Sequence, residues 1–408
     1  MKENKTYLFT QEMVSDGHPD KVVDAVTDAI LDEYLRHDIT VKLGCEGMAM
    51  KDLFILGGEV KSNAKINIEK IVRQTIIDIG YNKDDYGFNG YTLEIINKMV
   101  EQSPEINKMV INNGIDIGAN DQGIAYATSN NETKDFVSLP YYLARKFCYN
   151  VKNSNESYLR PDIKTQVSVE YNENHKPVRV HTVVISTSHS KDIMLKELRE
   201  NIFNNIVNPT IKSLDSNIKD LFDKETIYKI NEYGTFTIFG PKSDCGVSGR
   251  KIVCDSTYPM VGGGNMSGKC YFKNDRYAPY YARYISKNLV AAGIADQITI
   301  QLSYIIGDID VTSININTRG NKTNLSDIEI GEKIKELFSF KPKDIISKLK
   351  LANPIYLETS KWGHFGRESY MENGIEYFTW EKLDSVDIIK DRFKEHFIKE
   401  ELDSTMYI

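Results

Sequence analysis

The sequence predicts an α+β fold in which mixed or antiparallel sheets are covered by helices. Apolar and polar residues alternate, as in half-buried strands, over residues 53–60, 165–171, 178–187, 235–239, 251–254 and 298–306. Apolar residues recur with helical spacing over residues 20–35, 66–79, 141–151, 277–292, 325–338 and 385–399. Strands and helices do not alternate strictly, and the two strands around the turn at 172–177 indicate a hairpin. These patterns favour α+β over a doubly wound parallel sheet.

Composition restricts the class of protein further. A chain of 408 residues exceeds one ordinary core, so two or three domains are expected. An apolar fraction of 41% with a charged fraction of 27% is typical of globular proteins and excludes collagen-like and disordered classes. No apolar run reaches the roughly 20 residues that a membrane span needs, and the N-terminus does not resemble a signal peptide. We therefore expect no membrane partner.

Charge and cysteine usage favour a cytoplasmic protein that does not bind nucleic acid. The net charge of −7 disfavours non-specific attraction to a polyanion. The five cysteines lack CxxC spacing, which favours a reducing compartment and argues against a structural zinc site. One segment runs against the acidic trend, because residues 250–287 contain seven Lys or Arg and only two Asp. A small, highly charged anion fits such a local basic segment.

The first motif with chemical content is SDGHPDK at residues 15–21. It is typical of a helix start, with Pro19 in the first turn and free backbone N–H groups that attract anions. His18 and Lys21 add two donors beside it, and Asp20 is a candidate metal ligand. Acidic residues then recur every four positions, and we expect most of this stripe to be a solvated face: Asp24, Asp28 and Asp32.

The second motif is a glycine-rich basic region from Arg250 to Lys273, which we expect to cradle a polyphosphate. Glycines at 246–249 and 262–268 allow backbone N–H groups to approach phosphate oxygens, and the lysines and arginine neutralise them. The segment 263–269 has P-loop spacing, but Cys270 stands where a P-loop needs Ser or Thr. Asp275 is then the alternative metal ligand. A P-loop NTPase or kinase remains an alternative interpretation.

The absence of familiar catalytic motifs narrows the reaction. The sequence lacks a Gly-x-Ser-x-Gly elbow, a His-Glu-x-x-His motif, a kinase catalytic loop and a dinucleotide-binding fingerprint. The cradle also has no obvious nucleophile or general base near it in sequence. Transfer to a nucleophile that carries no proton, such as a thioether sulfur, needs neither group.

Taken together, the ordered motifs resemble the S-adenosylmethionine synthetase (methionine adenosyltransferase) family. The matching motifs are GHPDK at 17–21, GGE at 57–59, QSPEI at 102–106, DQG at 121–123, RPDIK at 160–164, DCGVSGRK at 244–251, GGG and SGK within 262–269, KNDR at 273–276 and GHFGRE at 363–368. The resemblance implies three similar, interwoven α+β domains related by pseudo-threefold symmetry. We place them at residues 5–103, 117–234 and 235–375, followed by an extended C-terminal tail at 376–408.

The resemblance also implies the reaction and its participants. ATP transfers its adenosyl group to the sulfur of L-methionine, and the released triphosphate is cleaved to phosphate and pyrophosphate. The implied cofactors are two Mg²⁺ ions per site and K⁺. The minimal active unit would be a homodimer, with a homotetramer as the alternative. A catalytically silent homologue that regulates an active subunit is a further alternative.

Residue roles follow from the same resemblance. The implied catalytic residues are His18, Lys164, Arg250 and Lys269. The implied ATP-binding residues are His18, Asp162, Lys164, Phe236, Asp244, Arg250, Lys251 and Lys269. The implied methionine-binding residues are Glu59, Gln102, Asp121, Asp244 and Lys273. The implied metal ligands are Asp20 and Asp275 for Mg²⁺ and Glu46 for K⁺.

Overall fold

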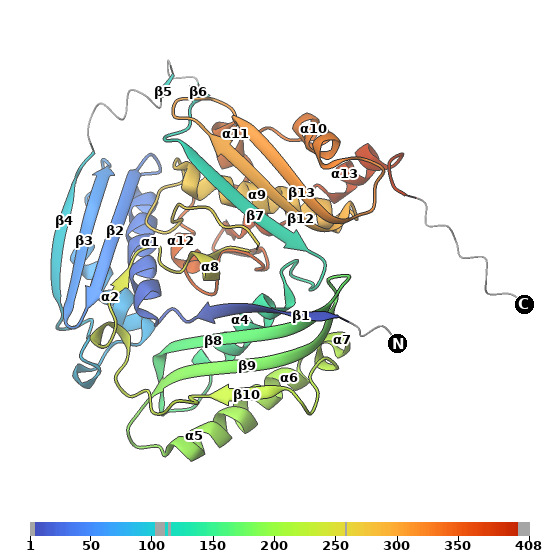
Figure 1. The fold of residues 1–408 in the computed structure, drawn as a ribbon. Coiled ribbons are helices and arrows are strands. Elements are labelled where there is room, and N and C mark those ends of the chain that lie inside the picture. Colours follow the sequence, from blue (N-terminus) through green and yellow to red (C-terminus); the bar gives the residue numbers. More distant parts are fainter. Residues whose placement is uncertain (1–4, 103–110, 113–115, 258, 399–408) are drawn as a thin grey trace, which may run out of the picture.

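The computed structural model describes residues 5–102, 111–112, 116–257 and 259–398 of the chain. Within them, three sheets surround a central region of loops and short helices (Figure 1). Each sheet has at least one long helix packed on it, which confirms the predicted α+β class. Two small two-stranded sheets complete the strands: β5 (Ile111–Asn112) with β6 (Asp116–Ile117), and β14 (Tyr370–Glu372) with β15 (Ile375–Tyr377).

The first sheet has the strand order β11-β2-β3-β4 and carries two helices on one face (Figure 1). Its elements are β2 (Lys42–Met50), β3 (Leu53–Lys61), β4 (Glu94–Glu101), β11 (Gly246–Val247), α1 (Pro19–His37) and α2 (Ile68–Ile79). β2 pairs antiparallel with β3, and β4 runs parallel to β3. On β3, Phe54 and Leu56 point to the helices and are fully buried. Ile55, one residue out of phase with them, remains partly exposed.

The second sheet has the order β1-β8-β9-β10. Its elements are β1 (Thr6–Val14), β8 (Leu159–Asn172), β9 (Pro177–His189) and β10 (Ile227–Ile230), with the helices α4 (Leu139–Lys152), α5 (Leu195–Ile202), α6 (Asn208–Lys212) and α7 (Ser216–Lys219). The predicted hairpin is confirmed, since β8 and β9 pair antiparallel around the turn after Asn172.

The third sheet has the order β13-β12-β7. Its elements and neighbours are β7 (Gly123–Asn130), β12 (Ala295–Tyr304), β13 (Ser313–Asn321), α9 (Asn274–Ala291), α10 (Asp327–Leu337), α11 (Pro342–Lys348), α12 (Tyr356–Thr359) and α13 (Val386–Phe393). α9 packs on β7 and β12. A capping box at Ser326 and Glu329 begins α10.

Each sheet takes strands from distant parts of the chain. β1 pairs with β8, β11 pairs with β2, and β7 pairs with β12. The three layers are therefore interwoven, as the resemblance implied. The domain boundaries given above stay a prediction.

Three of the predicted elements need correction. Residues 251–254 do not form a strand, because Ile252–Asp255 is the short helix α8. Residues 235–239 are irregular, and the strand of that region is β10, which lies upstream. The predicted helix at 385–399 is limited to Val386–Phe393. Alternation over four or five residues is too short to separate a strand from a helical turn or a loop.

The described part of the C-terminal tail, residues 376–398, packs against α9, the long helix of the third sheet. Glu381 is buried and accepts hydrogen bonds from Arg283 Nε at 3.1 Å and from Lys287 Nζ at 2.8 Å, both on α9. The backbone N–H of Gly366 donates to the same carboxylate at 2.7 Å. These ion pairs join the tail to α9 and to the preceding loop.

Candidate active site

The N-terminus of α1 carries a neutral histidine. His18 is the N-cap, and its Nδ1 accepts the backbone N–H of Asp20 at 3.2 Å. Burial lowers the pKa of His18 to about 3, and neighbouring cations act in the same direction. These cations are Lys251, Lys164 and Arg250. The ring is therefore uncharged near neutral pH, and its single proton is on Nε2, since Nδ1 is an acceptor.

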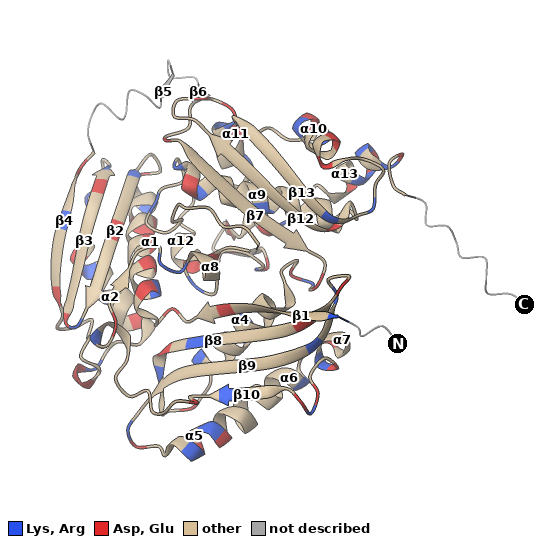
Figure 2. Ribbon diagram, viewed as in Figure 1, with Lys and Arg blue, Asp and Glu red and all other residues tan. Residues whose placement is uncertain are grey.

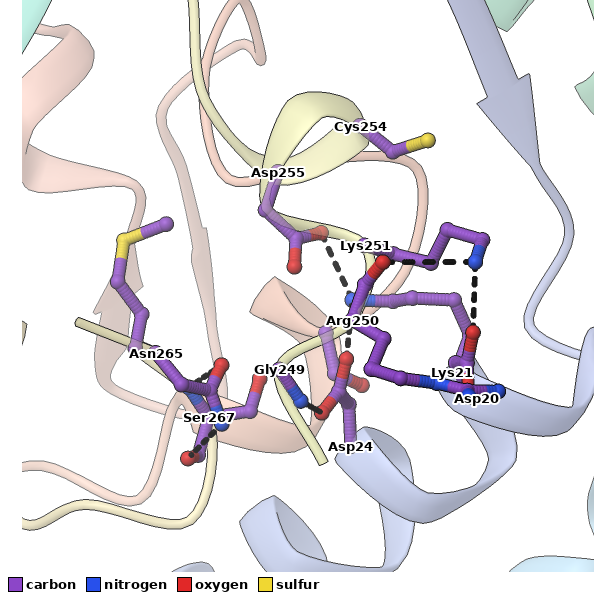
Figure 3. A network of polar contacts seen from close by, with 12 residues as sticks. Asp20, Lys21, Asp24, Gly249, Arg250, Lys251, Cys254, Asp255, Asn265 and Ser267 are labelled. Atoms are coloured by element: carbon purple, nitrogen blue, oxygen red, sulfur yellow. Dashed lines mark hydrogen bonds and ion pairs between the residues drawn. The ribbon is translucent and has the colours of Figure 1, made fainter. Parts of the chain in front are cut away.

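Asp20 is the centre of this cluster (Figure 3). Its Oδ1 accepts the N–H of Val247 and Nε of Arg250, both at 2.9 Å, and its Oδ2 accepts Nζ of Lys251 at 2.6 Å. The side chain is only 1% exposed. Burial opposes ionisation, but the bonds from Lys251 and Val247 lower the pKa of Asp20 below its usual value. We call His18, Asp20, Arg250 and Lys251 the helix cluster.

Two more predicted residues lie beside the end of β9: Asp162, on β8, and Phe236, in the irregular segment after β10. The N–H of Asp162 donates to Ser188 Oγ at 3.0 Å, and the N–H of Phe236 donates to His189 Nε2 at 3.0 Å. Asp162 is 5% exposed. Burial, assisted by the nearby charge of Asp244, raises the pKa of Asp162 to about 7. Asp162 is therefore a carboxyl group that titrates close to neutral pH.

The cations of the helix cluster differ in accessibility. The side chain of Arg250 is 48% exposed, and that of Lys251 is 16% exposed. Lys164, on β8, is 45% exposed and pairs with Glu12 at 2.8 Å. Arg250 and Lys164 can therefore reach a bound anion as they stand, whereas Lys251 would first have to leave Asp20.

A second cluster lies between β3 and the start of α9. Gln102 Nε2 donates to Glu59 Oε1 at 3.0 Å, and Lys273 Nζ is 3.5 Å from the same oxygen. Lys269 Nζ is 2.6 Å from Asp275 Oδ2. We call Glu59, Gln102, Lys269, Lys273 and Asp275 the pocket cluster.

Three members of this cluster, Glu59, Gln102 and Lys273, line a cavity of about 230 Å³. The lining combines charged, amide and apolar groups: Lys42, Glu59, Gln102, Asn120, Asp121, Cys270, Phe272, Lys273 and Ile306. Asn120 Oδ1 also accepts a hydrogen bond from the backbone N–H of Asn274 at 2.7 Å. This N–H is in the first turn of α9, where backbone donors have no partner within the helix. A cavity of this size with opposite charges at one end fits a small zwitterion with an apolar side chain.

Most of the predicted residues thus fall into two clusters rather than one site. Those that belong to neither cluster are Glu46, Asp121, Asp162, Lys164, Phe236 and Asp244. Within the described residues, none of the helix cluster lines the cavity of the pocket cluster. Glu46, on β2, lies close to two cations of the pocket cluster, Lys269 and Lys273. Partial desolvation raises the pKa of Glu46, while Lys269 and Lys273 oppose the rise.

The prediction of a solvated acidic stripe on α1 is wrong. Figure 2 shows acidic positions recurring along the helix, and Asp24, Asp28 and Asp32 are at most 3% exposed. Each accepts at least one backbone N–H from another segment. Apolar residues occur on every side of α1, which is typical of a buried helix and is visible in the sequence.

The predicted P-loop geometry is also absent from the described residues of this region. The glycine segment at 262–268 follows α8 and a loop rather than a strand. Residues 270–273 then separate Lys269 from α9.

The described chain has no cluster of three or more His, Cys, Asp or Glu side chains arranged as a metal site. In the same residues, no helix has the length and apolar character required to cross a bilayer.

Comparisons with known proteins agree with the order of the motifs. Three family models match: the S-adenosylmethionine synthetase N-terminal domain over residues 6–104, the central domain over 116–236 and the C-terminal domain over 238–382. A protein of Christiangramia forsetii named S-adenosylmethionine synthase is 40% identical, with 95% of this chain and 99% of the relative covered. A protein of the same name from Petrotoga mobilis is 41% identical, with 95% and 98% covered. The chain belongs to the S-adenosylmethionine synthetase family.

Proposed function

We propose that the helix cluster holds ATP together with Lys269 and Asp275, and that the other residues of the pocket cluster hold L-methionine. The activity of the chain is that of a methionine adenosyltransferase, which forms S-adenosylmethionine. The observation that carries the assignment of roles is a set of three ion pairs: Asp20 with Lys251, Asp275 with Lys269 and Glu59 with Lys273. In each pair, one member suits an anionic group of a ligand and the other suits a cationic group.

The helix cluster suits the triphosphate and nucleoside of ATP. Arg250, Lys251 and Lys164 supply positive charge, and the N-terminus of α1 adds its partial positive charge. Lys269 completes the phosphate-binding set. Asp162, Asp244 and Phe236 are assigned to the nucleoside, on the strength of the family resemblance and of the position of Asp162 and Phe236 beside β9.

The pocket cluster suits methionine. Lys273 can pair with the α-carboxylate, and Glu59, supported by Gln102, can pair with the α-ammonium. Asp121 forms part of the wall of the same cavity. Phe272 and Ile306 offer apolar contacts for the thioether chain.

The chemistry requires charge stabilisation rather than proton abstraction. A thioether sulfur has no proton to lose, so it attacks C5′ directly, the C5′–O bond breaks, and the electron pair leaves with the triphosphate. His18 can donate its Nε2 proton as a hydrogen bond to the leaving oxygen, because Nδ1 accepts the N–H of Asp20 and the neutral ring therefore carries its proton on Nε2. Arg250 and Lys269 stabilise the rest of the departing charge. We assign His18, Lys164, Arg250 and Lys269 as catalytic residues.

The donor chemistry of the site fits the implied cations. Asp20 and Asp275 are carboxylates, which Mg²⁺ prefers, and each is paired with a lysine proposed to bind phosphate. Transfer of these lysines to the triphosphate would leave Oδ2 of each carboxylate available to Mg²⁺. Bound Mg²⁺ would neutralise phosphate charge. Glu46, exposed on β2, is assigned to K⁺.

A homodimer is the proposed active unit. The face of the first sheet opposite α1 and α2 presents Ile55 and Ile96, which are partly buried, and Val100, which is 62% exposed. A second copy on this face would cover these apolar residues and bring the helix cluster of one chain to the pocket cluster of the other. Among the described residues, no member of the helix cluster lines the cavity beside Glu59 and Lys273, which supports a site shared between two chains. The five free cysteines favour a reducing compartment, and we assign the protein to the cytoplasm.

The test is incubation of the purified chain with ATP, methionine, Mg²⁺ and K⁺, with products identified by mass spectrometry. We expect S-adenosylmethionine together with phosphate and pyrophosphate. ADP without a sulfonium product would instead support the NTPase alternative, and no turnover would support a silent homologue. Sedimentation of the protein with and without Ile55→Asp tests the dimer, which this substitution should dissociate.

A further inference from the structure

We propose that Asp24 and Asp28 are positioning residues that fix the two glycine segments of the phosphate cradle on α1. This inference rests on the proposed function, because the cradle residues Arg250 and Lys269 are assigned to the triphosphate. Neither aspartate is assigned any role by the resemblance. Each acts through the backbone of a loop, not through contact with a substrate.

The contacts are equivalent in the two segments. Asp24 Oδ1 accepts the backbone N–H of Gly249 at 3.0 Å, as Figure 3 shows. Asp28 Oδ1 accepts the backbone N–H of Gly268 at 2.8 Å. These two bonds fix the backbone of each glycine segment to a side chain of α1.

Both anchored residues are turning points that precede a cradle cation. Gly249 has φ of +73° and is followed by Arg250, and Gly268 has φ of +76° and is followed by Lys269. Both glycines adopt the left-handed conformation that side chains rarely permit. A Cβ on Gly268 would also lie 2.1 Å from the carbonyl oxygen of Cys45. The direction in which each cation leaves the loop is therefore set at the residue that the aspartate holds.

The helix sets the spacing of the two segments. Asp24 and Asp28 are four residues apart, so their carboxylates lie on one face of α1 at a separation along the axis of about 6 Å. The two loops also touch each other, because a Cβ on Gly249 would lie 2.7 Å from Cβ of Asn265. A largely buried helix thus holds the two glycine segments in one register.

The two carboxylates are buried with their own counterions. Lys21 Nζ lies 3.1 Å from Asp24 Oδ2 and 2.7 Å from Asp255, and Arg276 Nη2 lies 2.9 Å from Asp28 Oδ1. Burial favours the neutral amine, but Asp255 and Asp24 raise the pKa of Lys21 above its usual value. Cations at these distances offset part of the cost of burying the two carboxyl groups and hold them in place.

Asp32 provides a matched control on the same stripe. It is 3% exposed and accepts the backbone N–H groups of Tyr356 and Leu357, both at 2.8 Å. These residues belong to α12 and not to the cradle. Substitution of Asp32 therefore removes a buried carboxylate and its backbone contacts without touching either glycine segment.

Two substitutions of Asp28 distinguish the effect of the acceptor's position from the effect of its charge. Its Oδ1 makes both contacts, while its Oδ2 has no hydrogen-bond partner among the described residues. Asp28→Asn keeps the Oδ1 acceptor and loses the charge. Asp28→Glu keeps the charge and moves the acceptor outward by about one C–C bond, roughly 1.5 Å.

The experiment measures binding of inorganic triphosphate by calorimetry, kcat and KM for both substrates, and urea unfolding, for the full chain and four variants. We expect Asp28→Glu to weaken triphosphate binding by about tenfold or more and to raise KM for ATP, with KM for methionine unchanged. We expect Asp28→Asn to stay within about threefold of the parent in triphosphate affinity. Asp32→Asn and Asp32→Glu should lower stability and leave triphosphate affinity unchanged.

Each other outcome has a defined meaning. Unchanged triphosphate affinity in Asp28→Glu would overturn the inference, and so would an equal loss in Asp28→Asn, since charge rather than position would then be decisive. An equal loss of triphosphate affinity in the Asp32 variants would show that the acidic residues of α1 act only through the stability of the fold, and would also overturn the inference. If the parent itself does not bind triphosphate, the proposed cradle is wrong and the inference falls with it. If Asp28→Glu does not fold, Asp24→Glu and Asp24→Asn test the same distinction at Gly249.

Discussion

Lys269→Met separates the catalytic contribution of the cradle from its contribution to folding. Lys269 Nζ is 2.6 Å from Asp275, but the two side chains are 17% and 29% exposed. A partly exposed ion pair of this kind contributes about 0–1 kcal/mol to stability. Removing a preorganised donor from a developing negative charge costs about 2.7–4 kcal/mol, which is roughly 10²–10³ in kcat. The catalytic effect should therefore exceed the folding effect several-fold.

The assay is steady-state formation of S-adenosylmethionine, measured alongside urea unfolding of the same preparation. Lys322→Met is a matched control, because Lys322 Nζ forms an ion pair with Asp296 at 2.9 Å outside both clusters. We expect the two variants to unfold at similar urea concentrations, while only Lys269→Met loses turnover. A Lys269→Met enzyme with near-normal kcat, or one that loses stability in proportion to its activity, would refute the placement of the cradle.

Three further predictions follow from buried groups. His18→Asn should slow adenosyl transfer by about 10²-fold and cleavage of added triphosphate much less, measured by single-turnover quenching; equal losses would remove the leaving-group role. Glu381→Leu should lower the free energy of unfolding by about 3–5 kcal/mol in urea titrations, because the buried Arg283 and the nearly buried Lys287 lose their shared partner. Burial raises the pKa of Asp162 to about 7 in the folded chain. Between about pH 4 and 7 this carboxyl group is therefore protonated in the folded chain but ionised in the unfolded chain. The free energy of unfolding therefore falls as the pH rises through that window. Urea unfolding of Asp162→Asn at several pH values should show a smaller fall than the parent chain. An unchanged dependence of the free energy of unfolding on pH would contradict the raised pKa.

Long periodic elements could be predicted from the sequence, and short ones could not. The patterns at 20–35 and 66–79 correspond to α1 and α2, because a helix of several turns repeats its apolar spacing often enough to be recognised. The four residues at 251–254 fit a strand by alternation, yet they form α8. Strand pairing between distant segments, such as β1 with β8, depends on tertiary packing that one sequence does not reveal.

The candidate site could be predicted as a set of residues but not as an arrangement. Motif order identified Asp20, Lys251 and Lys269, while their partners were known only from the structure. The burial of Asp28 was missed because an isolated acidic residue is normally solvated. Its counterion, Arg276, is distant in sequence, so no local pattern indicates the pair.

The most direct test of the proposed reaction is to determine which bond of ATP breaks. ATP labelled with a heavy oxygen isotope at the bridge between C5′ and the α-phosphorus would be converted by the full chain with methionine, and the products would be weighed by mass spectrometry. We expect the label to leave entirely with the phosphate products, because sulfur attack at C5′ breaks the C5′–O bond. Label retained on the nucleoside would show cleavage at phosphorus and would contradict adenosyl transfer.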